Sequence, residues 1–157
     1  VGMGEGSRDI LEVAFKLREL EVPSIPVNFL IPIAGNRVQE DGSLTPERCL
    51  RVLCLMRFVN PTAELRVAGG REGHLRSMQP FALYPANSLF VEGYLTTKGD
   101  PVEDTYAMIR DAGFEIEGND CWLPGAEREG DAAGAGRSQF RIPDGSDQLL
   151  KPEIARA

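Results

Sequence analysis

The sequence lacks the features that would assign it to a membrane, secretory or nucleic-acid-binding class. No apolar run approaches the roughly 18–20 residues that a membrane-spanning helix needs. The first residues lack the basic and then apolar stretch of a secretory signal, so we expect no export. Positive charge is also scarce, because 17 Lys and Arg stand against 24 Asp and Glu, for a net charge of −7. A nucleic-acid surface needs a concentrated basic patch, so we expect neither a membrane nor a nucleic acid as a partner.

Cysteine and histidine are also scarce. The three cysteines, Cys49, Cys54 and Cys121, form neither an even disulfide framework nor a metal-ligand spacing, which predicts a reducing, cytoplasmic setting. Cys49 and Cys54 lie five residues apart in an apolar stretch, which favours buried structural side chains over metal ligands. His74 is the only histidine and has no acid, cysteine or second histidine at a ligand spacing. We therefore expect His74 on the surface of a helix.

What the sequence does contain is an alternation of helix and strand patterns. With 157 residues and 42% hydrophobic residues, the chain is long and apolar enough to form a core. Apolar periodicity predicts a helix that Ser7 caps and Pro23 closes off, and the Thr45-Pro46-Glu47 and Asp100-Pro101 signatures each predict the start of another. Helices are expected near residues 7–20, 46–59, 72–83 and 101–113, with strands at 25–31, 63–68 and 87–91. This order predicts an α/β protein with a parallel sheet, either doubly wound or barrel-like.

The composition changes after Gly113, which is expected to cap the last helix. Residues 114–157 carry scattered glycines and acids with little periodicity. We therefore divide the chain into an α/β part, residues 1–113, and a mostly irregular tail, residues 114–157, whose composition favours disorder.

Strand parity identifies Arg66 as a candidate site residue. In residues 64–68, Leu65 and Val67 share one face and Arg66 points to the other. The same reasoning places Asn28 on that second face, which in a closed barrel is the interior. A buried guanidinium needs an acceptor. Two interpretations are evenly balanced on these grounds: an internal ion pair with a carboxylate such as Glu64, or contact with a bound ligand or metal cluster.

The Gly69-Gly70 pair follows that strand and opens the next helix. Glycines at such a place let backbone amides approach a phosphate. A single glycine pair more often marks a tight turn, so the turn is the favoured interpretation.

Four strings of the sequence resemble the biotin synthase family in their order and spacing. They are Val22–Ile33, Ala63–Glu72, Ala86–Phe90 and Tyr94–Thr97. The opening Gly2-Met3-Gly4-Glu5 resembles the end of the family's glycine and glutamate motif beside the S-adenosylmethionine site. The resemblance covers roughly residues 1–113 and implies the C-terminal half of a (β/α)8 TIM-type barrel. The chain also opens without an initiator Met, as we expect of a segment of a longer protein.

The resemblance implies a radical S-adenosylmethionine enzyme that inserts sulfur into dethiobiotin. In the family, a 4Fe-4S cluster held by a CxxxCxxC motif cleaves S-adenosylmethionine, and a 2Fe-2S cluster donates the sulfur. This sequence contains no CxxxCxxC motif, so we expect residues 1–157 to be inactive alone. The resemblance further implies a homodimer and a flavodoxin-type electron donor for the full-length enzyme.

Site residues follow from the resemblance position by position. Arg66 matches the unusual arginine ligand of the 2Fe-2S cluster, and Asn28 matches the residue that hydrogen-bonds the dethiobiotin ureido ring. Ser24 and Ser88 match hydroxyls that orient the arginine. The family's S-adenosylmethionine contacts fall on three further positions: Gly4, Glu5 and Ile31. Two alternatives remain open, namely another radical S-adenosylmethionine enzyme (methylornithine synthase-like or hydrogenase-maturation-like) and a non-catalytic α/β phosphate-binding or scaffold protein.

Overall fold

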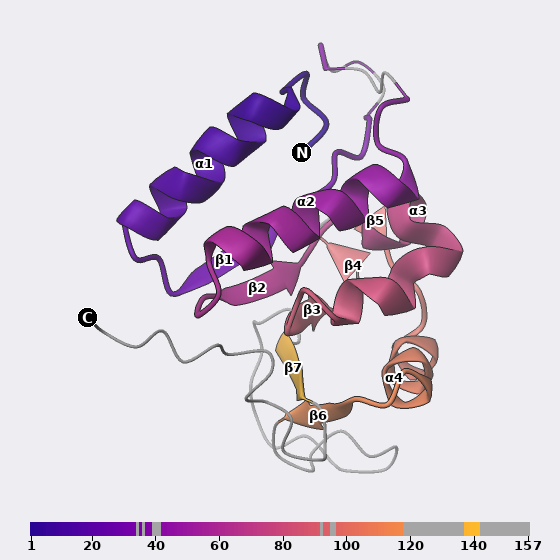
Figure 1. Ribbon diagram of the computed structural model, residues 1–157. Helices are drawn as coiled ribbons and strands as arrows, with labels where there is room; N and C mark the ends of the chain where they lie inside the picture. The colour runs from indigo at the N-terminus through magenta and orange to yellow at the C-terminus, as the bar shows by residue number, and fades with distance from the viewer. Residues whose placement is uncertain are drawn as a thin grey trace, which may run out of the picture.

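The computed structural model describes residues 1–33, 35, 37–38, 42–91, 93–94, 97–117 and 137–141. The alternation expected from the sequence is confirmed over residues 7–111, where helices follow and precede three parallel strands (Figure 1). None of the helices in these ranges is long and apolar enough to cross a membrane. Cys121 and most of the expected tail lie outside the described residues.

The main sheet has the strand order β1-β2-β3-β7-β6. Its parallel part consists of β1 (Ser24–Val27), β2 (Glu64–Val67) and β3 (Ser88–Phe90). Two strands from residues 114–157, β6 (Glu115–Glu117) and β7 (Arg137–Arg141), extend the sheet with antiparallel pairing. A separate hairpin pairs β4 (Gly93–Tyr94) with β5 (Thr97–Lys98). The structure thus shows a mixed α/β fold with a small parallel sheet.

Helices α1 (Ser7–Glu19) and α2 (Pro46–Val59) pack on each other, and α2 also packs on β2 (Figure 1). The expected start of α2 is confirmed, because the Thr45 side chain accepts a hydrogen bond from the Arg48 N–H at 3.2 Å and Pro46 opens the helix. The next crossover consists of α3 (Arg71–Leu75) and the 3-10 helix η1 (Arg76–Leu83), and α4 (Val102–Asp111) follows the hairpin. Gly113 follows α4 with φ +83°, as expected of a glycine that ends a helix.

Three local expectations were wrong. Gly6, rather than Ser7, is the N-cap of α1, and the Asp9 carboxylate accepts the Gly6 N–H at 2.7 Å. Strand β1 ends at Val27 rather than at residue 31. The helix expected over 72–83 is interrupted at Arg76, whose φ of +52° is incompatible with continuous α-helix, and Pro80 lies inside the second piece.

The hydrophobic core lies between the helices and one face of the parallel strands. Its strand residues alternate in sequence with polar or exposed ones, as half-buried strands require. They are Ile25, Val27, Leu65, Val67 and Leu89. Cys49 is fully buried in this core, as expected, whereas Cys54 is exposed, contrary to expectation. Burial raises the pKa of the Cys49 thiol to about 11.

Candidate functional site

The face of the sheet that points away from the helices carries a group of polar side chains. Parity and the strand register place Ser24, Glu64, Arg66 and Ser88 on this face, which we call the Arg66 face. The parallel register sets Ser24 opposite Glu64 and Arg66 opposite Ser88. Neighbouring parallel strands lie about 4.8 Å apart. Side chains that are distant in the sequence therefore converge around Arg66.

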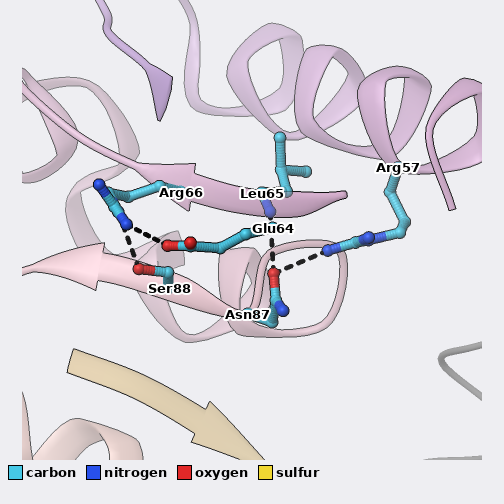
Figure 2. Close-up of polar contacts among 6 residues, drawn as sticks. All are labelled: Arg57, Glu64, Leu65, Arg66, Asn87 and Ser88. Carbon is cyan, nitrogen blue, oxygen red and sulfur yellow. Dashed lines mark hydrogen bonds and ion pairs between the residues drawn. The ribbon is translucent and has the colours of Figure 1, made fainter. Parts of the chain in front are cut away.

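Arg66 is the centre of the contacts in this group (Figure 2). Only 9% of the residue is exposed. Its Nε donates a hydrogen bond to Ser88 Oγ at 3.0 Å, and its Nη2 forms a buried ion pair with Glu64. The guanidinium also lies over the Phe90 ring, with Cζ 5.8 Å from the ring centroid. Two of the three guanidinium nitrogens are thereby oriented, and no described residue accepts a hydrogen bond from the third, Nη1.

The Glu64 contact is the ion pair that strand parity offered as one interpretation of Arg66. Glu64 and Arg66 stand two residues apart on the same strand, so their side chains share a face. Side-chain exposure is 11% for Arg66 and 19% for Glu64, so the pair is mostly removed from water. Such a pair is stable only if its remaining donors and acceptors are satisfied. Ser88, which is fully buried, satisfies one of them.

The Arg66 face leaves one guanidinium nitrogen for a contact beyond the described residues. Nη1 is the part of Arg66 with no acceptor among the described residues, and Ser88 and Glu64 fix the plane in which it lies. Within the same residues, no three His, Cys, Asp or Glu side chains come together as a metal site. Other ligands of a cluster would therefore come from outside the described residues.

Asn28 directly follows the carboxyl end of β1 and is exposed. Its Oδ1 accepts a hydrogen bond from the Gly69 N–H at 2.9 Å. The Nδ2 group donates to no described residue. The side chain is therefore anchored through its oxygen, and its nitrogen is available to an acceptor on a bound molecule.

The Gly69-Gly70 pair forms a tight turn after β2. A Cβ at Gly70, whose φ is +82°, would lie 2.2 Å from the Phe29 carbonyl oxygen, so only glycine fits. The Gly69 carbonyl accepts the Phe29 N–H at 2.8 Å, and the Gly69 N–H is bonded to Asn28. Because that amide is already paired, the turn lacks a donor that a phosphate cradle would use, and the turn interpretation is favoured.

The N-terminal loop places Gly4 and Glu5 before α1. The Glu5 carboxylate folds back on the loop and accepts the N–H groups of Gly2 and of Met3, the latter at 2.8 Å. Partial burial opposes ionisation of Glu5, but these hydrogen bonds outweigh it and lower its pKa below the usual value. Gly4 is exposed, with φ +102° and open space around its Cα.

Ile31 and Ser24 are the remaining expected site residues. Ile31 is half-buried beyond the end of β1, and its backbone makes no hydrogen bond within the described residues. Ser24 is half-buried at the start of β1 and lies opposite Glu64 in the register, with Pro26 opposite Arg66. The structure therefore brings Ser88 into contact with Arg66 and places Ser24 beside Glu64.

His74 was wrongly expected on the surface. It is 7% exposed, and its Nε2 lies 2.7 Å from the Leu30 carbonyl oxygen, so it joins α3 to the segment after β1. The Phe29 and His74 rings pack at 6.2 Å between centroids. The spacing of His74 from metal-ligating residues could not reveal its contact with Leu30, because the partner atom is a backbone carbonyl oxygen.

Sequence reasoning also missed Arg57 and Asn87, which meet where the chain enters β2 and β3 (Figure 2). Arg57 Nη2 donates to Asn87 Oδ1 at 2.9 Å, and the same oxygen accepts the Leu65 N–H at 2.9 Å. The only signal in the sequence was an arginine near the end of an otherwise apolar helix and an asparagine directly before Ser88.

The known proteins to which this chain is similar carry the same name. The chain is 55% identical over 152 residues to a protein from Acaryochloris marina named biotin synthase, covering 97% of this chain and 41% of the relative. Proteins of the same name from Leptospira interrogans and Streptomyces avermitilis are 56% and 51% identical, over 74% and 88% of this chain and 33% and 35% of the relatives. The chain thus spans about a third to two fifths of the length of these curated relatives.

The family comparison covers β2, β3 and the Arg66 face except for Ser24. The model of the Biotin and Thiamin Synthesis associated domain matches residues 26–115, which include β2, β3 and the helices between them. This match covers more than half of the 157 residues. The chain therefore belongs to the Biotin and Thiamin Synthesis associated domain family.

Proposed function

We propose that this chain is the C-terminal part of a biotin synthase, which inserts sulfur into dethiobiotin to form biotin. The three parallel strands then form part of a (β/α)8 barrel with the Arg66 face turned inward. The observation that carries the proposal is Arg66: a buried arginine on the face away from the helices, with Ser88 and Glu64 fixing two of its nitrogens. The identity of about 55% to proteins named biotin synthase supports the same assignment.

Arg66 is the residue that would hold a 2Fe-2S cluster. Its Nη1 is the proposed ligand atom and would have to give up a proton to bind iron. The Ser88 and Glu64 contacts prevent the guanidinium from rotating away. When bound, a 4Fe-4S cluster would supply the electron that cleaves S-adenosylmethionine, and the 2Fe-2S cluster would supply the sulfur that enters dethiobiotin. The Glu64 carboxylate offsets the positive charge of Arg66, which lowers the cost of burying it.

Asn28 is the proposed contact for the ureido ring of dethiobiotin. A ureido group offers both N–H donors and a carbonyl acceptor, and an amide side chain can pair with either. Because Oδ1 is anchored to the Gly69 N–H, the Asn28 Nδ2 group is the part that would donate to the ureido oxygen. The β2–α3 turn therefore orients the amide before the substrate arrives.

The S-adenosylmethionine contacts are proposed at Gly4, Glu5 and Ile31. The backbone groups of Ile31 make no hydrogen bond to described residues, so they are available to the edge of an adenine ring. The Glu5 carboxylate stabilises the loop that presents Gly4, whose surroundings are open. A cytoplasmic homodimer that receives electrons from a flavodoxin-type donor is proposed on the family resemblance.

The experiment uses the full-length protein that contains this chain, purified without oxygen and reconstituted with iron and sulfide. We expect it to bind dethiobiotin and to form biotin when supplied with S-adenosylmethionine and a reductant. Arg66→Met is expected to abolish or shift the absorption bands of the 2Fe-2S cluster and to retain cleavage of S-adenosylmethionine. Arg51→Met is the matched control, because Arg51 pairs with Glu47 on the exposed side of α2.

Two outcomes would contradict the proposal in different ways. A reconstituted protein that cleaves S-adenosylmethionine but does not bind dethiobiotin would be another radical S-adenosylmethionine enzyme. If the 2Fe-2S absorption bands are identical in Arg66→Met and Arg51→Met, Arg66 is not a ligand of the cluster, although the family assignment still holds.

A further inference from the structure

Asn87 clamps Leu65 at both of its backbone hydrogen-bonding groups. The Asn87 N–H donates to the Leu65 carbonyl oxygen at 3.0 Å, and the Leu65 N–H donates to Asn87 Oδ1 at 2.9 Å (Figure 2). A backbone bond and a side-chain bond between the same two residues fix how far β3 can slide along β2. The clamp joins residues that are 22 positions apart in the sequence.

This clamp determines which residue faces Arg66. Leu65 precedes Arg66 and Asn87 precedes Ser88, so pairing the first two residues sets Arg66 opposite Ser88. A slip of one residue would turn the Ser88 side chain to the other face of the sheet and bring a different residue opposite Arg66. The Ser88 Oγ contact at 3.0 Å therefore depends on the Asn87–Leu65 pair.

Arg57, on α2, contacts the Asn87 side chain and the segments before β2 and β3. Its Nε donates to the Pro85 carbonyl at 2.7 Å, and its Nη2 donates to Asn87 Oδ1 at 2.9 Å. Its Nη1 donates to carbonyl oxygens of the segment just before β2, including those of Pro61 at 3.0 Å and Ala63 at 2.8 Å. Arg57 thus connects the segments that enter β2 and β3.

The chemistry of Arg57 differs from that of an ordinary surface arginine. All of its described hydrogen-bond acceptors are carbonyl oxygens of the backbone or of Asn87, and none is a carboxylate. Burial without a countercharge lowers the pKa of Arg57. The planar guanidinium can satisfy several carbonyls in fixed directions, which a lysine ammonium cannot reproduce. This residue is therefore suited to holding backbone segments in place.

We propose that Arg57 and Asn87 are positioning residues that hold Ser88 against Arg66 and thereby fix the direction of the Arg66 guanidinium. The inference rests on the proposed function in one respect, namely that Arg66 Nη1 meets a 2Fe-2S cluster. The clamp itself is independent of the cluster and can be measured separately.

The first experiment measures the clamp in the full-length protein by hydrogen exchange of the Leu65 amide. Asn87→Ala removes the acceptor, and we expect exchange to become about tenfold faster, because the Leu65 N–H loses its partner. Asn87→Asp keeps an oxygen at the same place for both Leu65 and Arg57, and exchange is expected to stay near that of the parent protein. Equal exchange in Asn87→Ala and the parent would overturn the clamp.

The second experiment asks whether the clamp reaches Arg66. In the reconstituted full-length protein, Asn87→Ala and Arg57→Met are expected to shift the absorption bands or the reduction potential of the 2Fe-2S cluster. Asn87→Asp is expected to restore the parent spectrum, and Arg51→Met on the same helix is expected to leave it unchanged. Circular dichroism of each variant checks that the fold is retained, and Asn87→Asp provides the folded comparison if Arg57→Met is unstable.

The outcomes separate this inference from the proposed function. Faster exchange in Asn87→Ala with an unchanged cluster spectrum, in a protein whose spectrum does respond to Arg66→Met, overturns the positioning role alone. If the spectrum does not respond to Arg66→Met, the ligand assignment fails. The positioning role is then decided by the Arg66 Nε–Ser88 Oγ distance in crystal structures, which is expected to lengthen in Asn87→Ala and not in Asn87→Asp.

Discussion

The helix-facing side of the parallel strands carries Ile25, Val27, Leu65, Val67 and Leu89, all buried against the helices, whereas the other side carries Ser24, Glu64, Arg66 and Ser88. Apolar packing on the first side is non-directional and scales with buried area. Ion pairing and hydrogen bonding on the second side require particular atoms at particular distances. The first side therefore determines that the sheet forms, and the second depends on the register in which it forms.

The largest expected effect is on the helix-facing side. Leu65→Ala removes a side chain that is 1% exposed and leaves a cavity, which should lower the free energy of unfolding by about 3 kcal/mol. Urea unfolding followed by circular dichroism measures the change. Leu11→Ala on α1, where the leucine is 38% exposed, is the matched control and should cost less than about 1 kcal/mol. Equal losses in the two variants would contradict the assignment of the core.

A second prediction concerns how the free energy of unfolding depends on pH through Cys49, which lies in the core on the helix-facing side. The Cys49 pKa is raised from 9.0 to about 11 by burial, so the folded protein binds more protons than the unfolded chain between these values. Its contribution to stability is therefore fully present below pH 9 and falls as the pH rises toward 11, by roughly 2–3 kcal/mol.

Cys49→Ala, which removes this thiol, should lower the dependence of the unfolding free energy on pH between 9 and 11. Cys54→Ala is the control, since Cys54 is exposed. The prediction fails if Cys49→Ala and Cys54→Ala lose stability equally steeply over that range.

A smaller effect is expected on the Arg66 face. Glu64→Gln keeps the shape of the side chain but removes its charge, which leaves the mostly buried Arg66 guanidinium without a counterion. We expect the free energy of unfolding to fall by about 1–2 kcal/mol. Glu47→Gln, which breaks the exposed pair with Arg51, should cost less than about 0.5 kcal/mol. A loss in Glu64→Gln no larger than in Glu47→Gln would show that the Arg66 face does not depend on this pair.

The smallest effect is expected in the N-terminal loop. The Glu5 pKa is lowered in the folded protein, so its contribution to stability is present above its unfolded pKa and is lost as the pH falls through the folded value. Glu5→Gln should therefore lower stability at neutral pH by about 0.5 kcal/mol. The difference from the parent should disappear in acid, and a difference that persists there would contradict the role of the charge.

Much of the parallel α/β part could be predicted from the sequence because its signals are local. The Thr45-Pro46 helix start, Gly113 after α4 and the alternation in β2 depend on residues within a few positions of each other. The wrong expectations involve partners far along the chain. His74 is buried because it meets the Leu30 carbonyl, 44 residues away, and that contact leaves no periodic trace.

The sequence by itself determined which side of β2 Arg66 occupies, because side chains alternate along any strand. It also predicted the tight turn at Gly69-Gly70, but the need for glycine at position 70 comes from the Phe29 carbonyl, which the fold brings against it. Only the tertiary structure decided which atoms meet Arg66. Ser88 and the Asn87 clamp come from a strand 22 residues away. Their contact depends on register, which the Asn87–Leu65 pair holds together with the packing of whole strands and helices, and none of these contacts is local in the sequence.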